Sequence, residues 1–85
     1  MKLTAELSLY PFHEEYKPII KEFIARLHEH GDLEIVSNAM STQVCGDFDH
    51  VFAVIRQELK ASYNEQGRQV LVVKFIPGEL KLRTR

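Results

Sequence analysis

The segment from Asn38 to Asp47 holds the residues of this sequence best suited to bind a small polar molecule. Ser41 and Thr42 bring two hydroxyl groups to the start of a short β-prone run, and each hydroxyl can donate or accept a hydrogen bond. Such groups orient polar ligands, but they are equally common at ordinary strand starts and turns. The segment alone leaves the function open, and its meaning depends on what the fold places beside it.

The other residues with reactive side chains are isolated from one another. Cys45 has no base beside it in the sequence and is more typical of a small strand residue. Asp47 and Asp49 have the positions of helix caps rather than of a catalytic carboxylate pair. His28 and His30 stand two apart on an expected helix and cannot face one ligand together, and His13 and His50 lie elsewhere. Since a glycine-rich phosphate loop is also missing, we expect no enzymatic activity, no metal site and no cofactor.

Length and composition indicate one soluble domain spanning residues 1–85. The hydrophobic content of 45% suits a globular core, and the net charge of −1 argues against a nucleic-acid binder. A single cysteine excludes an intrachain disulfide bond, and no apolar run reaches the roughly 18–20 residues of a membrane span. The N-terminus also lacks the pattern of a signal peptide. We therefore expect a cytoplasmic protein without a membrane or nucleic-acid partner.

The first half of the chain predicts a strand, a helix and a second strand. Residues 3–10 alternate between apolar and polar side chains, which is typical of a strand with one buried face. The inward residues are Leu3, Ala5, Leu7 and Leu9, and the outward ones are Thr4, Glu6, Ser8 and Tyr10. An apolar stripe then predicts a helix from Glu14 to His30, with Pro18 in its first turn and Gly31 as the residue that ends it. A strand over residues 33–38 follows.

The second half predicts a strand, a helix and a final strand. The third strand spans residues 41–46, and Asp47 or Asp49 caps a helix that ends near residues 64–67. Its expected apolar face is Val51, Phe52, Ile55 and Leu59, with Val54 at the margin. The fourth strand spans residues 69–76 and ends at Pro77-Gly78. The basic tail, residues 77–85, is expected to be either flexible or an arm used in oligomerisation.

This order of elements is typical of a ferredoxin-like α+β sandwich. It predicts a four-stranded antiparallel sheet in the order 4-1-3-2, with both helices on one face. Antiparallel neighbours place the end of strand one beside the start of strand three. Residues 8–10 should therefore meet residues 41–42 at one end of the sheet.

The open face of this sheet could itself receive a ligand. It carries Tyr10, on which a flat heteroaromatic ring could stack, together with hydroxyl groups and the carboxylate of Glu6. The alternative is that the face is solvated or covered by another subunit, and that Glu6 forms a cross-strand ion pair with Lys74. The expected strand three has no basic or aromatic residue, which argues against an RNA-recognition module.

Three short motifs resemble a known family. They are Glu6-Leu7-Ser8-Leu9-Tyr10-Pro11, Met40-Ser41-Thr42 with Gly46-Asp47, and Phe48-Asp49-His50-Val51-Phe52. In this order and spacing, over residues 3–76, the chain is similar to the YkoF-like thiamine/hydroxymethylpyrimidine-binding proteins. The resemblance implies a ferredoxin-like fold, self-association through sheets, and binding of the aminopyrimidine part of thiamine. It also implies a site that uses Ser8, Tyr10, Met40, Ser41 and Thr42, to which geometry adds Glu6 and Asn38.

Two functions follow from these observations. The first is a non-catalytic binding protein for thiamine or its hydroxymethylpyrimidine part, serving salvage or transport. The second is a homo-oligomeric regulatory or scaffolding domain whose open face is only a subunit interface. A chain of this size buries only about 60–65% of its unfolded surface, so under either function we expect a homodimer or a dimer of dimers.

Overall fold

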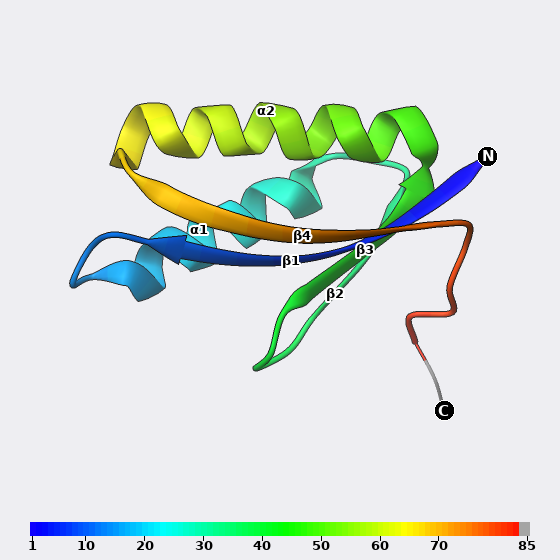
Figure 1. Cartoon of the computed structure of the whole chain (residues 1–85), viewed down its shortest axis with the longest axis horizontal. Coiled ribbons are helices and arrows are strands. Elements are labelled where there is room, and N and C mark those ends of the chain that lie inside the picture. Colours follow the sequence, from blue (N-terminus) through cyan, green and yellow to red (C-terminus); the bar gives the residue numbers. More distant parts are fainter. Residues whose placement is uncertain (84–85) are drawn as a thin grey trace.

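The computed structural model describes residues 1–83 and has two helices packed on one four-stranded sheet (Figure 1). The elements are β1 (Lys2–Pro11), α1 (Tyr16–Glu29), β2 (Leu33–Ser37), β3 (Thr42–Asp47), α2 (Phe48–Gln66) and β4 (Gln69–Pro77). The sheet order is β2-β3-β1-β4, and every pair of neighbours is antiparallel. The predicted ferredoxin-like fold is confirmed, with strand ends that differ by about one residue from the sequence-based ranges.

The core lies between the sheet and both helices. The alternation of β1 is confirmed, because Leu3, Ala5, Leu7 and Leu9 are all buried in the core cluster. Ile35 and Val44 add to this layer from β2 and β3. From α1 the cluster takes Ile19, Phe23 and Leu27, and from α2 it takes Val51, Val54 and Ile55. The strand that carries the expected site residues is therefore fixed by apolar packing along most of its length.

The first helix is shorter than the sequence suggested. It begins at Tyr16 rather than at Glu14. Glu15 takes the cap position, and its side chain makes no capping hydrogen bond. Pro18 still falls in the first turn, where its missing N–H group costs nothing. The helix ends at Glu29, and the left-handed residue of the following turn is Asp32 (φ 64°) rather than Gly31.

The buried face of α2 is rotated from the expected one. Asp47 is the cap, accepting from the backbone N–H of His50 at 3.3 Å. Val54 is buried, whereas Phe52 remains 42% exposed and stacks on Phe75 with ring centroids 4.4 Å apart. The placement of Phe52 in the core and Val54 at the margin was wrong. Two polar residues of α2, Glu58 and Ser62, are buried against α1 and β4, and hydropathy alone does not predict that.

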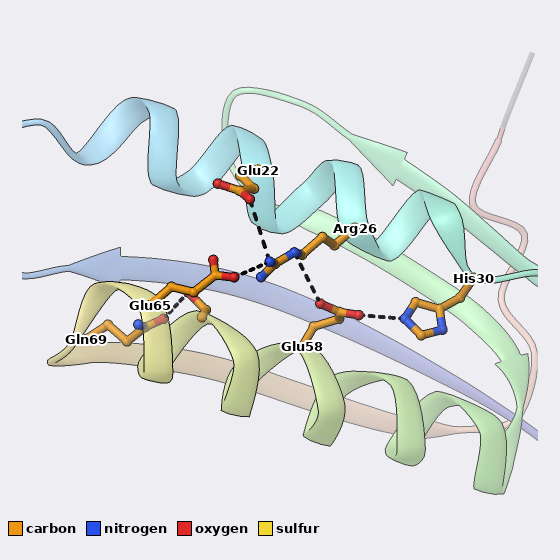
Figure 2. A network of polar contacts seen from close by, with 7 residues as sticks. Glu22, Arg26, His30, Glu58, Glu65 and Gln69 are labelled. Carbon is orange, nitrogen blue, oxygen red and sulfur yellow. Dashed lines mark hydrogen bonds and ion pairs between the residues drawn. The ribbon is translucent and has the colours of Figure 1, made fainter.

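Figure 2 shows the polar network that joins the two helices. Nε2 of His30 lies 2.7 Å from Oε2 of Glu58, and Nε of Arg26 lies 4.0 Å from Oε1 of the same carboxylate. Arg26 also pairs with Glu65 and Glu22. The hydrogen bond to Glu65, helped by the nearby carboxylates, raises the pKa of Arg26 against a smaller opposing effect of burial. The Glu58 side chain is only 7% exposed, so these contacts satisfy a charge that would otherwise be buried alone.

The chain beyond β4 turns back across the open face of the sheet (Figure 1). Thr4 donates its hydroxyl to the carbonyl of Gly78 at 3.0 Å and accepts from the N–H of Leu80 at 3.1 Å. Arg83 then reaches the carbonyl of Ile35 on the outer strand at 3.2 Å. Thr4, expected to be an outward residue, is consequently only 3% exposed. Residues 84–85 of the predicted flexible tail or arm lie outside the described residues.

Candidate functional site

A cavity of about 440 Å³ lies where the end of β1, the start of α1 and the β2–β3 connection meet. Residues 7–11 of β1 and residues 38–42 of the connection form two of its walls. The third wall comes from α1 through Tyr16, Ile20, Phe23 and Ile24. The two polar segments that the topology was expected to join do meet here, since Leu7 pairs with Thr42 in the β1–β3 ladder.

Asn38 shapes the connection between β2 and β3. Its Oδ1 accepts hydrogen bonds from the backbone N–H groups of Met40, at 2.9 Å, and of Ser41, at 3.1 Å. Its own N–H donates to the carbonyl of Ser41 at 3.1 Å. An asparagine side chain that bonds the backbone two and three residues ahead holds a tight turn. Asn38 thus lines the cavity, while its carboxamide oxygen is already used to hold the loop.

Thr42 provides the buried polar group of the cavity. Because Thr42 stands opposite Leu7, its side chain lies on the helix side of the sheet, where it is 6% exposed. Its hydroxyl lies 2.7 Å from that of Ser37, and either oxygen could be the donor. Thr42 therefore keeps at least one hydrogen-bonding position for a molecule in the cavity.

Ser41 is held by a chain of contacts on the opposite, open face. Its hydroxyl donates to Oε2 of Glu6 at 2.7 Å and accepts from Nε2 of Gln43 at 2.7 Å. Nζ of Lys74 lies 3.6 Å from Oε1 of Glu6, so the predicted cross-strand ion pair is present. The bond from Ser41 and the charge of Lys74 lower the pKa of Glu6, against a smaller opposing effect of burial. Glu6 does not line the cavity, and its position indicates that it anchors Ser41.

Ser8, Tyr10 and Met40 line the cavity from its edge. Ser8 and Tyr10 alternate along β1 with the buried Leu7 and Leu9, so their side chains lie on the open face. Tyr10 is 56% exposed, and Met40 at the tip of the connection is 86% exposed. The cavity therefore opens to solvent beside the exposed side chains of Tyr10 and Met40.

The wall provided by α1 was not identified from the sequence. Ile19, Phe23 and Leu27 are buried, whereas Tyr16, Ile20 and Ile24 form a parallel stripe that is only partly covered. An apolar stripe wider than one sheet face can cover indicates either a ligand or a partner. That excess width of the apolar stripe was the signal available in the sequence.

The described part of the chain holds no group of three or more histidine, cysteine or acidic residues arranged to bind a metal ion. Within residues 1–83, neither helix is long and apolar enough to span a membrane.

Comparison with solved structures supports the fold strongly. A protein from Streptococcus pneumoniae superposes with a TM-score of 0.84 at 23% identity, covering 94% of this chain and 90% of that one. A Thermotoga maritima protein assigned to thiamine biosynthesis or salvage gives 0.79 at 18% identity, covering 88% of this chain and 82% of that one. A protein of Methanocaldococcus jannaschii gives 0.79 at 26% identity, covering 98% and 87%. These similarities establish a shared fold.

A family comparison is more specific. A search of curated proteins finds no matching sequence. The family model described as thiamine-binding protein, however, matches residues 5–76. That range contains most of β1, both helices and nearly all of β4, together with every wall of the cavity. The chain therefore belongs to the thiamine-binding protein family.

Proposed function

We propose that this protein binds thiamine or its hydroxymethylpyrimidine part in the cavity between β1, α1 and the β2–β3 connection. The observation that carries the proposal is the make-up of this cavity in a chain of the thiamine-binding family. Its volume of about 440 Å³ lies within the range of roughly 300–1,000 Å³ typical of small-molecule sites. Six of the seven residues expected from the sequence line it: Ser8, Tyr10, Asn38, Met40, Ser41 and Thr42.

The cavity has the chemistry that a flat heteroaromatic ring requires. Leu9, Ile20 and Phe23 supply apolar walls, and the Thr42 hydroxyl supplies a polar group deep in the site. Burial of an apolar ring against such walls is worth about 25 cal/mol per Å². Polar atoms on the ring then fix its orientation, since a buried polar group without a partner costs about 1–3 kcal/mol.

The charge of the cavity favours the unphosphorylated forms of the ligand. No lysine or arginine is among the residues that line it. Lys74, the basic residue of the neighbouring strand β4, is paired with Glu6 on the open face. Within residues 1–83, the start of α1, at Tyr16, is the one helix N-terminus beside the cavity, and the lining offers a phosphate neither an arginine fork nor a lysine, so we expect thiamine to bind better than thiamine diphosphate.

The residues around the cavity also favour binding over catalysis. Its hydroxyl groups have no histidine, cysteine or carboxylate beside them among the lining residues. Glu6, the nearest carboxylate in the network, is held by Ser41 and Lys74. A site that retains a ligand without an acid–base pair suits a carrier in salvage or transport.

A thermal-shift screen tests the proposal. Thiamine, hydroxymethylpyrimidine, thiamine monophosphate and thiamine diphosphate would each be added at graded concentrations. A ligand at 100 times its dissociation constant should raise the free energy of unfolding by about 2.7 kcal/mol. We expect the first two compounds to raise the melting temperature at the lowest concentrations. Four compounds without effect at millimolar concentration would contradict the proposal.

A subunit interface on the open face is the second candidate function. It is favoured by Tyr10, Val70 and Val72, which lie side by side on β1 and β4 and remain 44–56% exposed. Ile76, at 44%, extends the patch. Light scattering at micromolar protein would show a homodimer or a dimer of dimers. A monomeric mass would remove this candidate while leaving the ligand site untouched.

A further inference from the structure

The main-chain groups of β1 alternate between its two neighbours. On the β4 side, the N–H of Phe12 donates to the carbonyl of Arg68 at 3.1 Å, and the carbonyl of Lys2 accepts from Gly78 at 2.8 Å. On the β3 side, the carbonyl of Met1 accepts from the N–H of Phe48 at 2.8 Å. In an antiparallel sheet, the N–H and C=O groups of one residue point to the same neighbouring strand, and those of the next residue point to the other. The N–H and C=O of even-numbered residues of β1 therefore point to β4, and those of odd-numbered residues point to β3.

Leu9 is the first odd-numbered residue beyond the end of the β1–β3 ladder. The last pair of that ladder is Leu7 with Thr42, and the residue in register with Leu9 would be Met40. Met40 is turned away, because its N–H donates to Oδ1 of Asn38. Among residues 1–83, no backbone or side-chain partner is found for Leu9 on this edge, and Leu9 lines the cavity. One donor and one acceptor on the same residue thus face the proposed site.

We propose that the main chain of Leu9 recognises the ligand. Its N–H would donate to a ring nitrogen, and its C=O would accept from an amino group on the adjacent ring carbon. The class of ligand that fits is a flat heterocycle with these two groups side by side, as in an aminopyrimidine. This inference rests on the proposed function and goes further, because it assigns specificity to backbone groups that no side-chain substitution removes.

The edge of β1 beyond the β1–β3 ladder is short, which favours binding of a small ring over pairing with an added strand. The next odd-numbered residue is Pro11, which has no N–H group and can stand in β1 because its main chain faces the β3 side, where the ladder has already ended at Leu7 and Thr42. A second chain would therefore find one complete donor–acceptor pair, whereas strand addition depends on several. The α1 wall, with Ile20 and Ile24, also covers the space beside this edge. A planar ring can enter that space between the sheet and the helix.

Amide NMR of the uniformly ¹⁵N-labelled protein tests the assignment without any mutation. Hydroxymethylpyrimidine is the probe. We expect the amide proton of Leu9 to move downfield and to exchange more slowly with water as the probe is added. The amide of Leu7, already paired with Thr42, is the internal control and should keep its exchange rate.

The outcomes separate this inference from the proposed function. Shifts around Thr42 and Tyr16 without any change at the Leu9 amide would overturn the backbone assignment while supporting the ligand site. An absence of any shift with both hydroxymethylpyrimidine and thiamine would overturn both. Slow exchange at Leu9 that depends on protein concentration, without ligand, would show that another chain pairs with the edge and would also overturn the assignment.

Ligand analogues supply the matched chemical test. One analogue lacks the amino group, and another has carbon in place of the ring nitrogen beside it. Each should bind about 5- to 150-fold more weakly, because one main-chain group of Leu9 is left without a partner. An analogue with carbon at the other ring nitrogen is the control and should keep its affinity. Equal affinity for all three analogues would contradict the assignment.

Discussion

The hydroxyl of Ser41 donates a hydrogen bond of 2.7 Å to the carboxylate of Glu6, joining residues 35 positions apart in the sequence. This contact ties the β2–β3 connection to the middle of β1, and Lys74 of β4 supports the same carboxylate from the other side. The connection that forms one wall of the cavity is thereby tied to two further strands of the sheet, directly to β1 and through Glu6 to β4. The network lies on the open face, while the cavity it supports lies on the face covered by α1.

Acidification should weaken the contacts of Glu6 with Ser41 and Lys74. The bond from Ser41 and the charge of Lys74 lower the pKa of Glu6 from its usual value of 4.5. The ionised carboxylate therefore stabilises the fold fully above about pH 4.5, and this contribution is lost as the pH falls through the lower folded value. Urea unfolding should show the wild type more stable than Glu6→Gln at neutral pH, with the difference shrinking in acid. A difference that does not change with pH would contradict the role of the charge.

Removal of the Thr42 hydroxyl should weaken ligand binding more than folding. Thr42→Val keeps the shape of the side chain and leaves Ser37, which is exposed, free to bond water. We expect a loss of about 1–3 kcal/mol in binding free energy, measured by calorimetry, because a polar atom of the ligand loses its partner. Ser37→Ala is the control, since Ser37 does not line the cavity. If Thr42→Val binds thiamine as tightly as the wild type, Thr42 is not a ligand contact.

Gly46 should tolerate no side chain. A Cβ atom at this position would lie 2.7 Å from Cδ2 of Leu33 and 3.0 Å from the carbonyl oxygen of Asp32. We expect Gly46→Ala to lower the free energy of unfolding by about 1–3 kcal/mol, as is usual when a packed core is overfilled. Gly31→Ala is the matched control, because a Cβ there meets no atom within 4 Å. Equal melting temperatures for the two variants would show that β2 can move aside.

The contact between His30 and Glu58 should stabilise the pairing of the helices. His30→Ala leaves one oxygen of a nearly buried carboxylate without its partner at 2.7 Å, although Arg26 remains near the other oxygen. We expect the free energy of unfolding to fall by about 1–3 kcal/mol. His28→Ala on the exposed side of α1 should have little effect. A variant of His30 as stable as that of His28 would argue that water replaces the imidazole.

The fold could be predicted because the strongest signals of the sequence are local and periodic. The alternation from Leu3 to Leu9 defines the buried face of β1, and the order of elements restricts the topology to one common arrangement. The error at Phe52 and Val54 has a physical cause, since Glu58 and Ser62 occupy buried positions that hydropathy assigns to the surface. The partners of Glu58, Arg26 and His30, are distant in sequence, and Gln69, the partner of Ser62, belongs to the strand that follows α2.

The site was predictable only in part. The junction of residues 8–10 with residues 41–42 follows from antiparallel pairing, and the cavity forms there. Which face each side chain takes depends on register, and Ser41 and Thr42 lie on opposite sides of the sheet. The sequence also could not show that Met40 turns away from β1, because that depends on the bonds of Asn38. Those bonds leave Leu9 without a strand partner.

Equilibrium dialysis with labelled thiamine is the most direct test of the ligand site, because it counts bound molecules. We expect saturation at one thiamine per chain in the wild-type protein. Ala39→Trp should abolish this uptake, since Ala39 lines the cavity from an exposed loop, where a large ring fills the space without disturbing the core. Ala53→Trp, exposed on α2 and away from the cavity, should bind as the wild type does. A protein that takes up no thiamine, or that takes it up equally with Ala39→Trp, would contradict the proposed function.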